Sequence, residues 1–447
     1  MNLKRNIENI KKNYSLGIIG GGQLALMLAE AANNRGIKVC VQTKSSNDPA
    51  GSKADYVIEA DPLKVKGNKD LIKECEKIIF ENEWIKIEKL NLIESKNIFV
   101  PSLESIQPLV DRISQKILIE RLNLPSPRWK PIREFKSLTD EEIEYWNFPL
   151  MIKSYKGGYD GKGNRKINTK EDLDSFFVET NSEEWIIEEW VDYKNEFALV
   201  GSRDFDGTIR FFPVVETFQK NNICDWVLSP AEIDYDLNTF AKNIFSSIVN
   251  ELDYVGVMGI EFFYGDKGLL INEVAPRTHN SAHFSIEACS SSQFDQYVCI
   301  SSGIKPPEIK MHCQGSLMIN LLGLNKKFPF SIIKRLELLS QIKGSNLHWY
   351  GKSKESVGRK MVLVFDAHLL NSGQGEAANA FLKILEEPPP NTTIILITDY
   401  MELLLPTILS RCQKIAFPKL NNEYLEEWCS INTVSYTHLT LPTKRIV

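Results

Sequence analysis

The chain has 447 residues, of which 43% are hydrophobic and 25% are charged, and its formal net charge is −5. This length predicts about three domains, and the composition excludes a disordered, collagen-like or disulfide-scaffold chain. The net negative charge gives no electrostatic reason to expect nucleic-acid binding by the whole chain. The eight cysteines form no CxxC pair, and neither a membrane-spanning apolar run nor a signal peptide is recognisable, so we expect a cytoplasmic protein with reduced thiols.

The first predicted unit alternates strands with a helix. A short apolar strand at 16–19 leads through a glycine turn into a helix at 24–35, which Gly36 ends, and a β-branched strand follows at 37–41. Further strands are predicted at 56–59, 78–80 and 98–100. This order predicts a parallel sheet in an N-terminal domain of about 110 residues.

Beyond residue 100 the pattern changes twice. Helices are predicted at 106–122 and 140–146; strands then dominate, at 150–153, 185–189, 196–200, 209–215, 259–264 and 269–272, with helices at about 236–252 and 294–301. After Met361 the sequence indicates a strand–helix–strand–helix fragment of about 70 residues, which is too short to bury a nucleotide-binding core by itself.

The glycine turn after the first strand carries the pattern Gly20-x-Gly22-x-x-Ala25. Backbone amides at the start of the following helix could bind a phosphate there. A dinucleotide site would also need an acidic residue at the end of the second strand, where residues 42–44 are Gln, Thr and Lys, so the sequence disfavours NAD. A tight turn that serves only helix–strand packing remains open.

The loop KSYKGGYDGKGN at 153–164 begins with a strand-ending lysine and contains four glycines. Its amides and ammonium groups predict a flap over a polyphosphate, which we favour over a plain hairpin. The loop is not a Walker A motif, because Gly163 follows Lys162 where a hydroxyl residue would be needed.

Acidic residues follow on the predicted strands. The backbone at 189–191 could pair with a purine and Glu196 could accept from a ribose, although a cluster that includes Glu188 is more often a solvated face. Glu261 and Glu273 lie on consecutive apolar strands, where paired carboxylates could share magnesium with nucleotide phosphates. Cross-strand pairing with Lys or Arg is the alternative, and we favour the metal.

Two later segments are rich in basic and polar residues. The loop at 275–285 gathers Arg277, His279, Asn280, Ser281 and His283, which predicts a pocket for an anionic substrate. Zinc is not expected, because no third soft ligand has suitable spacing. Lys352, Arg359 and Lys360 could form a phosphate clamp or a solvated charged face.

Taken in order, six motifs resemble the 5-(carboxyamino)imidazole ribonucleotide synthase family of the ATP-grasp superfamily: GGGQLA, GGYDGKGN, VGSRDFDG, NEVAPRTHNSAHFSIEA, LHWYGK and GRKM. The resemblance covers about residues 14–361. It implies an α/β ATP-grasp fold with an N-terminal parallel-sheet pre-ATP-grasp domain and a C-terminal extra fragment. It also implies a cytoplasmic, homodimeric carbon–nitrogen ligase of purine biosynthesis, which carboxylates aminoimidazole ribonucleotide with ATP and bicarbonate through carboxyphosphate.

The resemblance further implies site residues. The ATP contacts would be Arg112, Lys153, Gly158, Tyr159, Asp160, Gly161, Lys162, Gly163, Asn164, Glu188, Glu189, Trp190, Val191, Glu196, Gln219, Asn272 and Glu273. Magnesium would lie on Glu261 and Glu273. The ribonucleotide or bicarbonate would contact Gly22, Gln23, Arg277, Asn280, Lys352, Arg359 and Lys360, and the catalytic residues would be Arg277, Tyr159, Asp160 and Lys352. Two departures are Gln219, where the family usually has His, and Thr278 in place of a common Pro.

Residues 362–428 resemble a different family, the clamp-loader subunits (delta-prime or gamma/tau) of bacterial DNA polymerase III. The alternative function, an AAA+ clamp-loader subunit, would use Asp366 in a Walker B strand and Arg411 as an arginine finger, but the chain contains no Walker A. The tail is similar to translated adapter sequence, which leads to the hypothesis of a chimaeric gene model. The two resemblances imply a pre-ATP-grasp domain at 14–110, a helical linker and small ATP-grasp lid at 111–184, and a large ATP-grasp domain at 185–323. A truncated C-terminal subdomain at 324–361, a clamp-loader-like fragment at 362–428 and an unstructured tail at 429–447 would follow.

Overall fold

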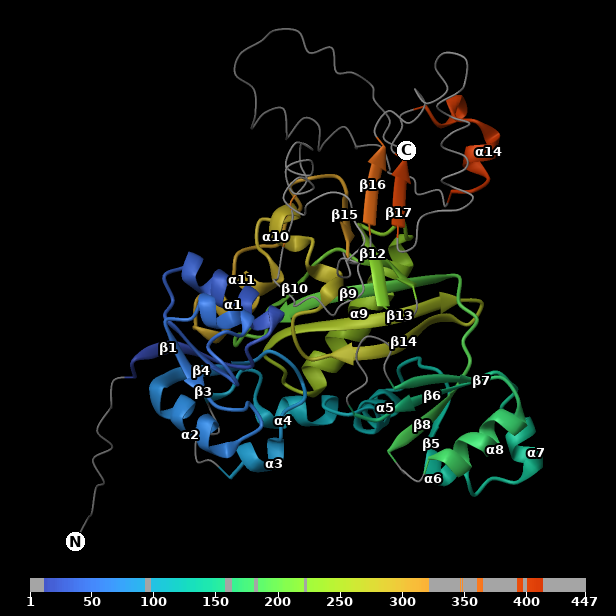
Figure 1. Ribbon diagram of the computed structural model, residues 1–447, viewed down its shortest axis with the longest axis horizontal. Helices are drawn as coiled ribbons and strands as arrows, with labels where there is room; N and C mark the ends of the chain where they lie inside the picture. The colour runs from blue at the N-terminus through green and yellow to red at the C-terminus, as the bar shows by residue number, and fades with distance from the viewer. Residues whose placement is uncertain are drawn as a thin grey trace. The chain divides into compact units, whose positions relative to one another are not determined.

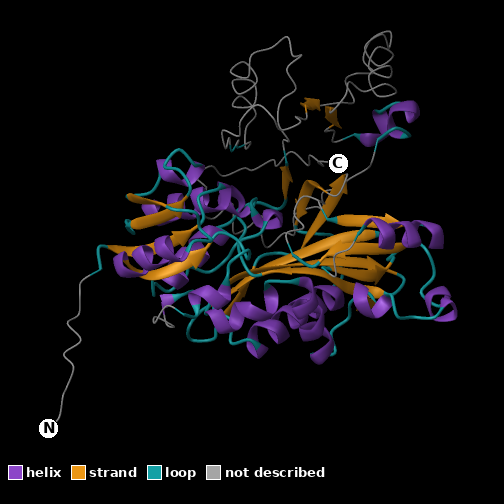
Figure 2. Ribbon diagram, turned by 60° about the horizontal axis from the view of Figure 1, so that its bottom comes forward, coloured by secondary structure: helices purple, strands orange, loops and turns teal. Residues whose placement is uncertain are grey.

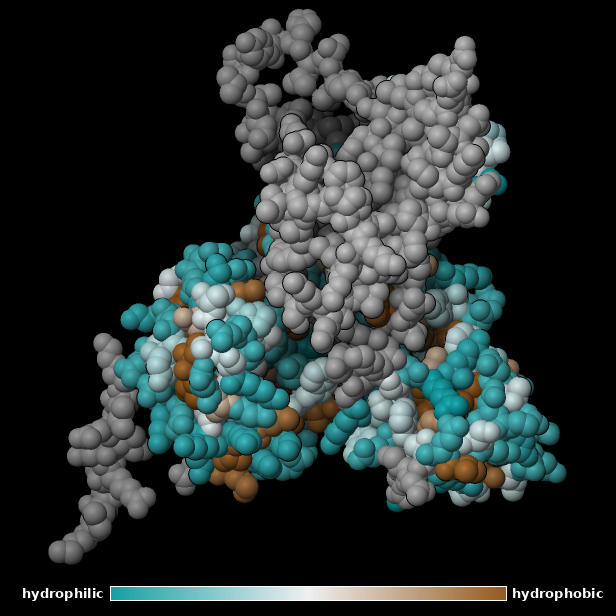
Figure 3. All heavy atoms as spheres, viewed as in Figure 1, coloured by the Kyte–Doolittle hydropathy of each residue, from teal (hydrophilic) through white to brown (hydrophobic). Residues whose placement is uncertain are grey.

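The computed structural model divides the chain into two units, Met1–Ile319 and Asn320–Val447, and each is described by itself. The residues that the structure describes are 12–92, 98–156, 163–180, 184–220, 223–320, 346, 348, 360–364, 392–396 and 400–412. No helix in these ranges is both long and apolar enough to cross a membrane. In the view of Figure 3, hydrophilic residues cover most of the coloured surface of the first unit, with small apolar patches between them.

The N-terminal domain is built on a parallel four-stranded sheet in the order β3-β2-β1-β4 (Figure 1, blue). Its elements are β1 (Tyr14–Ile19), α1 (Gln23–Asn34), β2 (Val39–Thr43), η1 (Pro49–Ser52), β3 (Tyr56–Glu59), α2 (Val65–Glu74), β4 (Cys75–Phe80) and α3 (Ile87–Leu90). The parallel sheet is therefore confirmed. The strand predicted at 98–100 is wrong: the chain there makes only an isolated bridge between Ile78 and Phe99.

The helix predicted at 106–122 is broken into three short segments, α4 (Leu103–Ile106), η3 (Gln107–Leu109) and α5 (Arg112–Arg121). Asp111 has an extended backbone, and its side chain accepts a hydrogen bond from the Ser114 N–H, so it caps a new helix. This cap places Arg112 at the first position of α5.

A small α+β domain carries an antiparallel sheet in the order β5-β8-β6-β7. Its elements are β5 (Trp129–Pro131), α6 (Ile132–Phe135), α7 (Asp140–Glu144), β6 (Leu150–Ser154), β7 (Asn164–Ile167), α8 (Lys170–Glu179) and β8 (Trp185–Glu189). Lys153 on β6 pairs with Asn164 on β7, so these two strands flank the glycine-rich loop.

The large domain contains a long antiparallel sheet in the order β14-β13-β9-β11-β12-β15, and β10 pairs with β9. Its elements are β9 (Asn195–Arg203), β10 (Ile209–Phe211), β11 (Val215–Lys220), β12 (Ile223–Ser229), α9 (Tyr235–Glu251), β13 (Gly256–Gly265), β14 (Gly268–Ala275), η4 (Asn280–Ala282), α10 (Ser285–Ala288), α11 (Gln293–Ser301) and β15 (Ser316–Ile319). The strand predicted at 209–215 is thus two strands, and β12 was not predicted.

One face of this sheet is covered by helices, as Figure 2 shows. Ile244 and Ile248 of α9 and Leu118 of α5 pack against Met258 and Ile260 of β13 in one buried cluster. Successive side chains of a strand point to opposite faces, so Glu261 of β13 lies on the other face, which is free of this core. That face carries the site.

In the second unit, β16 (Lys360–Val364) pairs in parallel with β17 (Thr392–Leu396), and the unit also contains η6 (Met401–Leu403) and α14 (Pro406–Leu409). β16 runs across the Met361–Val362 junction. The first helix of the strand–helix–strand–helix fragment predicted after Met361 lies outside the described residues.

Candidate active site

Glu261 of β13 and Glu273 of β14 are direct register partners on adjacent antiparallel strands. The predicted matched positions are therefore confirmed. The register shifts immediately afterwards, so that Phe262 faces Ile271 and Asn272 is an extra residue in a β-bulge. Ile271 and Val274 both point into the core. The bulge therefore lets Asn272 and Glu273, both partly exposed, lie on the open face, where strict alternation would allow only one of them.

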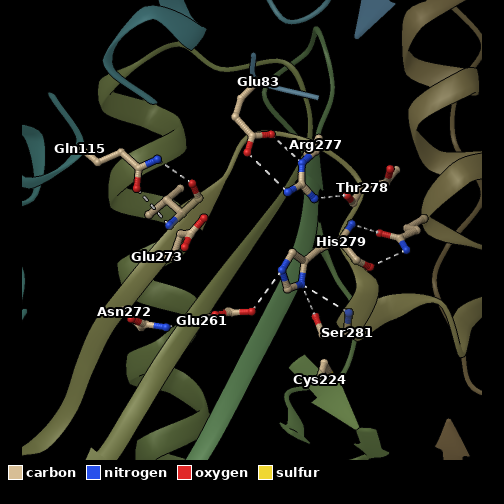
Figure 4. A network of polar contacts seen from close by, with 12 residues as sticks. Glu83, Gln115, Cys224, Glu261, Asn272, Glu273, Arg277, Thr278, His279 and Ser281 are labelled. Carbon is tan, nitrogen blue, oxygen red and sulfur yellow. Dashed lines mark hydrogen bonds and ion pairs between the residues drawn. The ribbon is translucent and has the colours of Figure 1, made fainter. Parts of the chain in front are cut away.

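Gln115 of α5 holds the backbone beside this bulge. Its side chain donates to the Val274 carbonyl at 2.9 Å and accepts from the Val274 N–H at 3.2 Å (Figure 4). A bulge interrupts the regular ladder, and the amide of Gln115 satisfies backbone groups at this point. Gln115 was not predicted from the sequence.

Each carboxylate has cationic or amide partners. The Oε1 atom of Glu261 lies 3.3 Å from Nε2 of His279, and its Oε2 accepts from Nδ2 of Asn272 at 3.1 Å. Oε2 of Glu273 accepts from Nη2 of Arg112 at 2.9 Å. Burial raises the pKa of Glu261, but His279, Asn272 and Lys153 outweigh it and lower the pKa. Both side chains remain partly open, at 28% and 33% exposure, so they are accessible carboxylates.

The strand-end Lys153 joins the small domain to these acids. Its Nζ donates to Oδ1 of Asn272 at 3.0 Å and lies 2.7 Å from Oε2 of Glu188. Asn272 in turn contacts Glu261, so the base of the predicted flap and the predicted metal ligands belong to one network. Family resemblance and predicted strand pairing were the only reasons to expect these residues in one site. The hydrogen bonds show which of their atoms are in contact.

Glu188 lies between two lysines. Besides Lys153, the ammonium of Lys116 on α5 lies 2.8 Å from its Oε1. Burial raises the pKa of Glu188, but Lys116 and then Lys153 overcome this and lower it to about 2. Lys116 was not predicted from the sequence, although its spacing of one helical turn from Arg112 was a usable signal.

Arg112 ties α5 to the start of the glycine-rich loop. Its Nη1 donates to the Ser154 carbonyl at 2.8 Å, and its backbone N–H donates to the Tyr155 carbonyl at 3.0 Å. Gly158, Tyr159, Asp160, Gly161 and Lys162 lie outside the described residues. Gly163 has a φ of 93°, which favours glycine, and Asn164 begins β7.

Glu196 of β9 lies on the same face as Glu261. Burial first, and then the charge of Glu261, raise its pKa to about 7, while hydrogen bonds from Tyr193 and Gln219 oppose the rise. Tyr193 stacks on Phe263 with ring centroids 4.6 Å apart. Gln219 thus contacts the carboxylate that was predicted to bind ribose.

The residues after Glu188 have contacts of their own. Lys267 pairs with Glu189 at 2.9 Å, and the ammonium of Lys166 lies 4.1 Å from the ring centroid of Trp190. Val191 is partly exposed. These side-chain contacts leave the predicted role of the 189–191 backbone untested.

Arg277 joins the large domain to the N-terminal domain. Its Nε donates to Oε2 of Glu83 at 2.6 Å, and its Nη1 donates to the Thr278 carbonyl at 3.2 Å (Figure 4). Glu83 was not predicted; its position just after a parallel strand was the available signal. Burial raises the pKa of Glu83, but Arg277 overcomes this and lowers it, so the pair is charged.

The glycine turn of the N-terminal domain contains a carboxylate from the chain itself. The Gly22 N–H donates to Oε2 of Glu81 at 2.9 Å, beside Gln23, the first residue of α1. Gly20 has a φ of 123°, and a side chain there would overlap Glu81. A phosphate in this turn would therefore have to displace or share the site with Glu81.

His279 and Gln293 brace the loop beyond Arg277. Nδ1 of His279 lies 2.8 Å from Oγ of Ser281, and its backbone N–H donates to Oε1 of Gln293 at 2.7 Å. Asn280 begins η4. Lys352 and Arg359 lie outside the described residues, and Lys360 begins β16 in the second unit, so the predicted basic clamp stays a prediction.

Comparisons with known families agree with this architecture. Residues 14–109 match the family model of the ribonucleotide synthetase preATP-grasp domain, and residues 117–294 match that of the ATP-grasp domain. The chain is an ATP-grasp enzyme. Its relatives show to which ATP-grasp family it belongs. The N5-carboxyaminoimidazole ribonucleotide synthase of Synechococcus elongatus is 36% identical over 347 residues, which cover 77% of this chain and 87% of that relative. The chain belongs to the N5-carboxyaminoimidazole ribonucleotide synthase family.

Solved structures are similar over the same part. The Staphylococcus aureus synthetase complexed with ADP has a TM-score of 0.70 at 32% identity and covers 78% of this chain and 92% of its own. The Aspergillus clavatus synthase, in complex with ADP and 5-aminoimidazole ribonucleotide, has a TM-score of 0.67 at 27% identity with the same coverage. The ATP-grasp fold predicted from the motifs is thus confirmed.

The C-terminal part matches a second family. Residues 339–421 match the family model described as DNA polymerase III, delta subunit. This confirms the resemblance to a clamp-loader subunit, although the match begins before the predicted change at Met361. The domain boundaries that we predicted remain predictions.

Proposed function

We propose that the chain catalyses the ATP-dependent carboxylation of 5-aminoimidazole ribonucleotide with bicarbonate in purine biosynthesis. In the proposed reaction, bicarbonate attacks the γ-phosphorus of ATP to give carboxyphosphate and ADP. Carboxyphosphate releases carbon dioxide and phosphate, and the amino group of the ribonucleotide takes up the carbon dioxide to form the carbamate. The observation that carries the proposal is the network in which Lys153, Asn272 and Glu261 connect the small domain to the large sheet.

The charges of this network suit a triphosphate. Lys153 and Arg112 approach from the small domain and α5, and Glu261 and Glu273 approach from the large sheet. Cationic groups held in place stabilise the negative charge that develops during phosphoryl transfer. Glu196, on the same face, would accept from the ribose hydroxyls.

Glu261 and Glu273 also fit a magnesium ion by their chemistry. Both are partly exposed carboxylates on one sheet face, and magnesium is usually held by one or two carboxylates together with substrate phosphates. Among the described residues, no group of three or more His, Cys, Asp or Glu could hold an ion without such help. Bound magnesium would supply charge neutralisation of the phosphates.

Arg277 supports the second half of the reaction. Its guanidinium is held by Glu83 of the N-terminal domain, and a fork of N–H donors matches a carboxylate or phosphate. We assign it to the anionic intermediate or the ribonucleotide phosphate, next to the glycine turn of Gly22 and Gln23.

The test is ADP release by the purified full chain. We expect release to require both aminoimidazole ribonucleotide and bicarbonate, and the carbamate to appear in equal amount. ADP release that needs neither compound would overturn the proposed reaction.

A homodimer belongs to the same proposal and rests only on the family resemblance, whereas the cytoplasmic location rests on that resemblance and on the scattered cysteines of the sequence. For the second unit, the match at 339–421 supports clamp-loader ancestry. The matched part contains no Walker A motif, so we expect no ATPase activity that depends on primed DNA and a sliding clamp. The chimaeric origin remains a hypothesis, which a contiguous genomic read across the codons for Met361 and Val362 tests.

A further inference from the structure

Three charged side chains form a buried triad beside the phosphate site. Lys116, Glu188 and Lys153 are 4%, 2% and 7% exposed, and Glu188 gives one oxygen to each lysine. Two positive charges and one negative charge leave the triad with one net positive charge. A buried excess charge is costly unless an anion compensates it. Glu261, whose pKa burial raises and Lys153 helps to lower, gives part of this compensation, and the triad still favours a further anion such as a phosphate.

The two lysines of the triad are not equivalent. Lys153 also contacts Asn272, on the open sheet face. Lys116 lies on α5 on the large-domain side of the pair, and its Nζ is 2.8 Å from Oε1 of Glu188, so its partner is the carboxylate rather than a group on the open face. Burial first, and then Lys153 and Arg112, lower the pKa of Lys116, whereas Glu188 raises it.

We propose that Lys116 is a positioning residue. By pairing with one of the two carboxylate oxygens of Glu188, it leaves part of the positive charge of Lys153 uncompensated and able to attract a phosphate. The inference rests on the proposed function, because it assigns Lys153 to a nucleotide phosphate. Lys116 itself does not touch the nucleotide in this account.

The physical reason is a competition for Lys153. Without Lys116, Glu188 would pair with Lys153 alone, and the isolated pair would be neutral. The nearest ammonium to the phosphate would then be compensated from within the protein, and its attraction for the ligand would fall. Removing the negative charge of Glu188 as well would restore one uncompensated charge on Lys153. This charge balance separates positioning from a packing role.

The experiment measures the binding of ADP to the full chain by calorimetry, with adenosine as the probe that lacks phosphates. We expect Lys116→Met to weaken ADP binding about tenfold or more, with adenosine binding unchanged. Lys116→Arg should keep affinity within about threefold, because it keeps the charge. The double variant Lys116→Met/Glu188→Gln should bind ADP more tightly than Lys116→Met does, because it restores one uncompensated charge on Lys153.

A matched control is Lys170→Met, which removes a lysine from an exposed ion pair with Asp140 and should leave ADP binding unchanged. Thermal melting of each variant checks folding. If Lys116→Met binds ADP as the unaltered chain does, the inference is wrong. If the double variant binds as weakly as Lys116→Met, Lys116 contacts the nucleotide or only packs, and the inference is also wrong. Failure of the proposed function is recognised separately, since the unaltered chain would then release no ADP in response to ribonucleotide and bicarbonate.

Discussion

Lys153 and Asn272 are 119 residues apart in the chain, and the lysine ammonium donates to the asparagine carbonyl oxygen at 3.0 Å. One lies at the end of a strand in the small sheet, and the other is the bulged residue of the long sheet. The contact therefore brings the end of a strand in the small sheet next to the strand of the long sheet that carries Glu273.

Lys153→Ala should lower ATP turnover about a hundredfold or more, because an ammonium aimed at phosphate stabilises the transition-state charge. Folding should change little, since Glu188 keeps its ion pair with Lys116. Steady-state ADP release and a thermal melt measure the two effects. Unchanged turnover would remove the phosphate assignment of Lys153.

Glu273→Gln should raise the magnesium concentration that gives half-maximal activity about tenfold, because an amide is a weaker ligand for this ion than a carboxylate. Glu251→Gln, at an exposed pair with Arg121, is the control and should behave as the unaltered chain. A magnesium titration of ADP release gives the answer. Equal half-maximal concentrations for both variants would exclude Glu273 as a ligand.

Arg277→Lys should lower carboxylation about a hundredfold or more, because lysine cannot reproduce a planar fork held by Glu83. ADP binding should stay the same, since Arg277 is assigned to the other substrate. Product formation and ADP calorimetry are measured side by side. A loss of ADP binding that equals the loss of activity would contradict this division of the site.

Glu196 should make stability and nucleotide binding depend on pH. Burial raises the pKa of Glu196 from 4.5 to about 7. Between these two pH values the carboxyl group is therefore protonated in the folded protein but ionised in the unfolded chain. Its contribution to stability is full below about pH 4.5 and is lost as the pH rises through 7. ADP binding should change in the opposite direction and weaken below pH 7, where the carboxylate becomes a poorer acceptor.

The measurement compares the unaltered chain with Glu196→Gln by urea unfolding and ADP calorimetry across this pH range. We expect the difference in unfolding free energy between the two proteins to vary with pH. A difference that stays constant from pH 4.5 to 7 would show that Glu196 has an ordinary pKa.

Gly20→Ala should lower the free energy of unfolding by about 2–3 kcal/mol, because the backbone is left-handed and the new methyl group would overlap Glu81. Gly268→Ala is a matched control. It also has a positive φ, of 78°, but no atom lies within 4 Å of the new Cβ, so only the backbone cost of about 1 kcal/mol remains. Urea unfolding measures both, and equal losses would mean that the contact with Glu81 adds nothing.

Much of the fold could be predicted from local patterns. The parallel strands of the N-terminal sheet and the hairpin of Glu261 and Glu273 follow from apolar runs and glycine turns, which act over a few residues. The break between α4 and α5 was missed, because the apolar spacing continues across Asp111 while its side chain caps a new helix. Likewise, the predicted strand at 98–100 makes one bridge only, since propensity does not decide whether a strand finds a partner.

The kinds of chemistry present can be recognised in the sequence: a glycine- and lysine-rich loop, two acids on adjoining strands, and motifs in the order of a known family. The partners of these groups follow from the three-dimensional packing. A bulge turns Asn272 and Glu273 to one face, and Glu188 is shared by two lysines. Glu83 pairs with Arg277, and Glu81 accepts a hydrogen bond from the glycine turn. The reason is physical. A side chain's charge is a local property, whereas its partner is set by packing between segments that can lie more than a hundred residues apart.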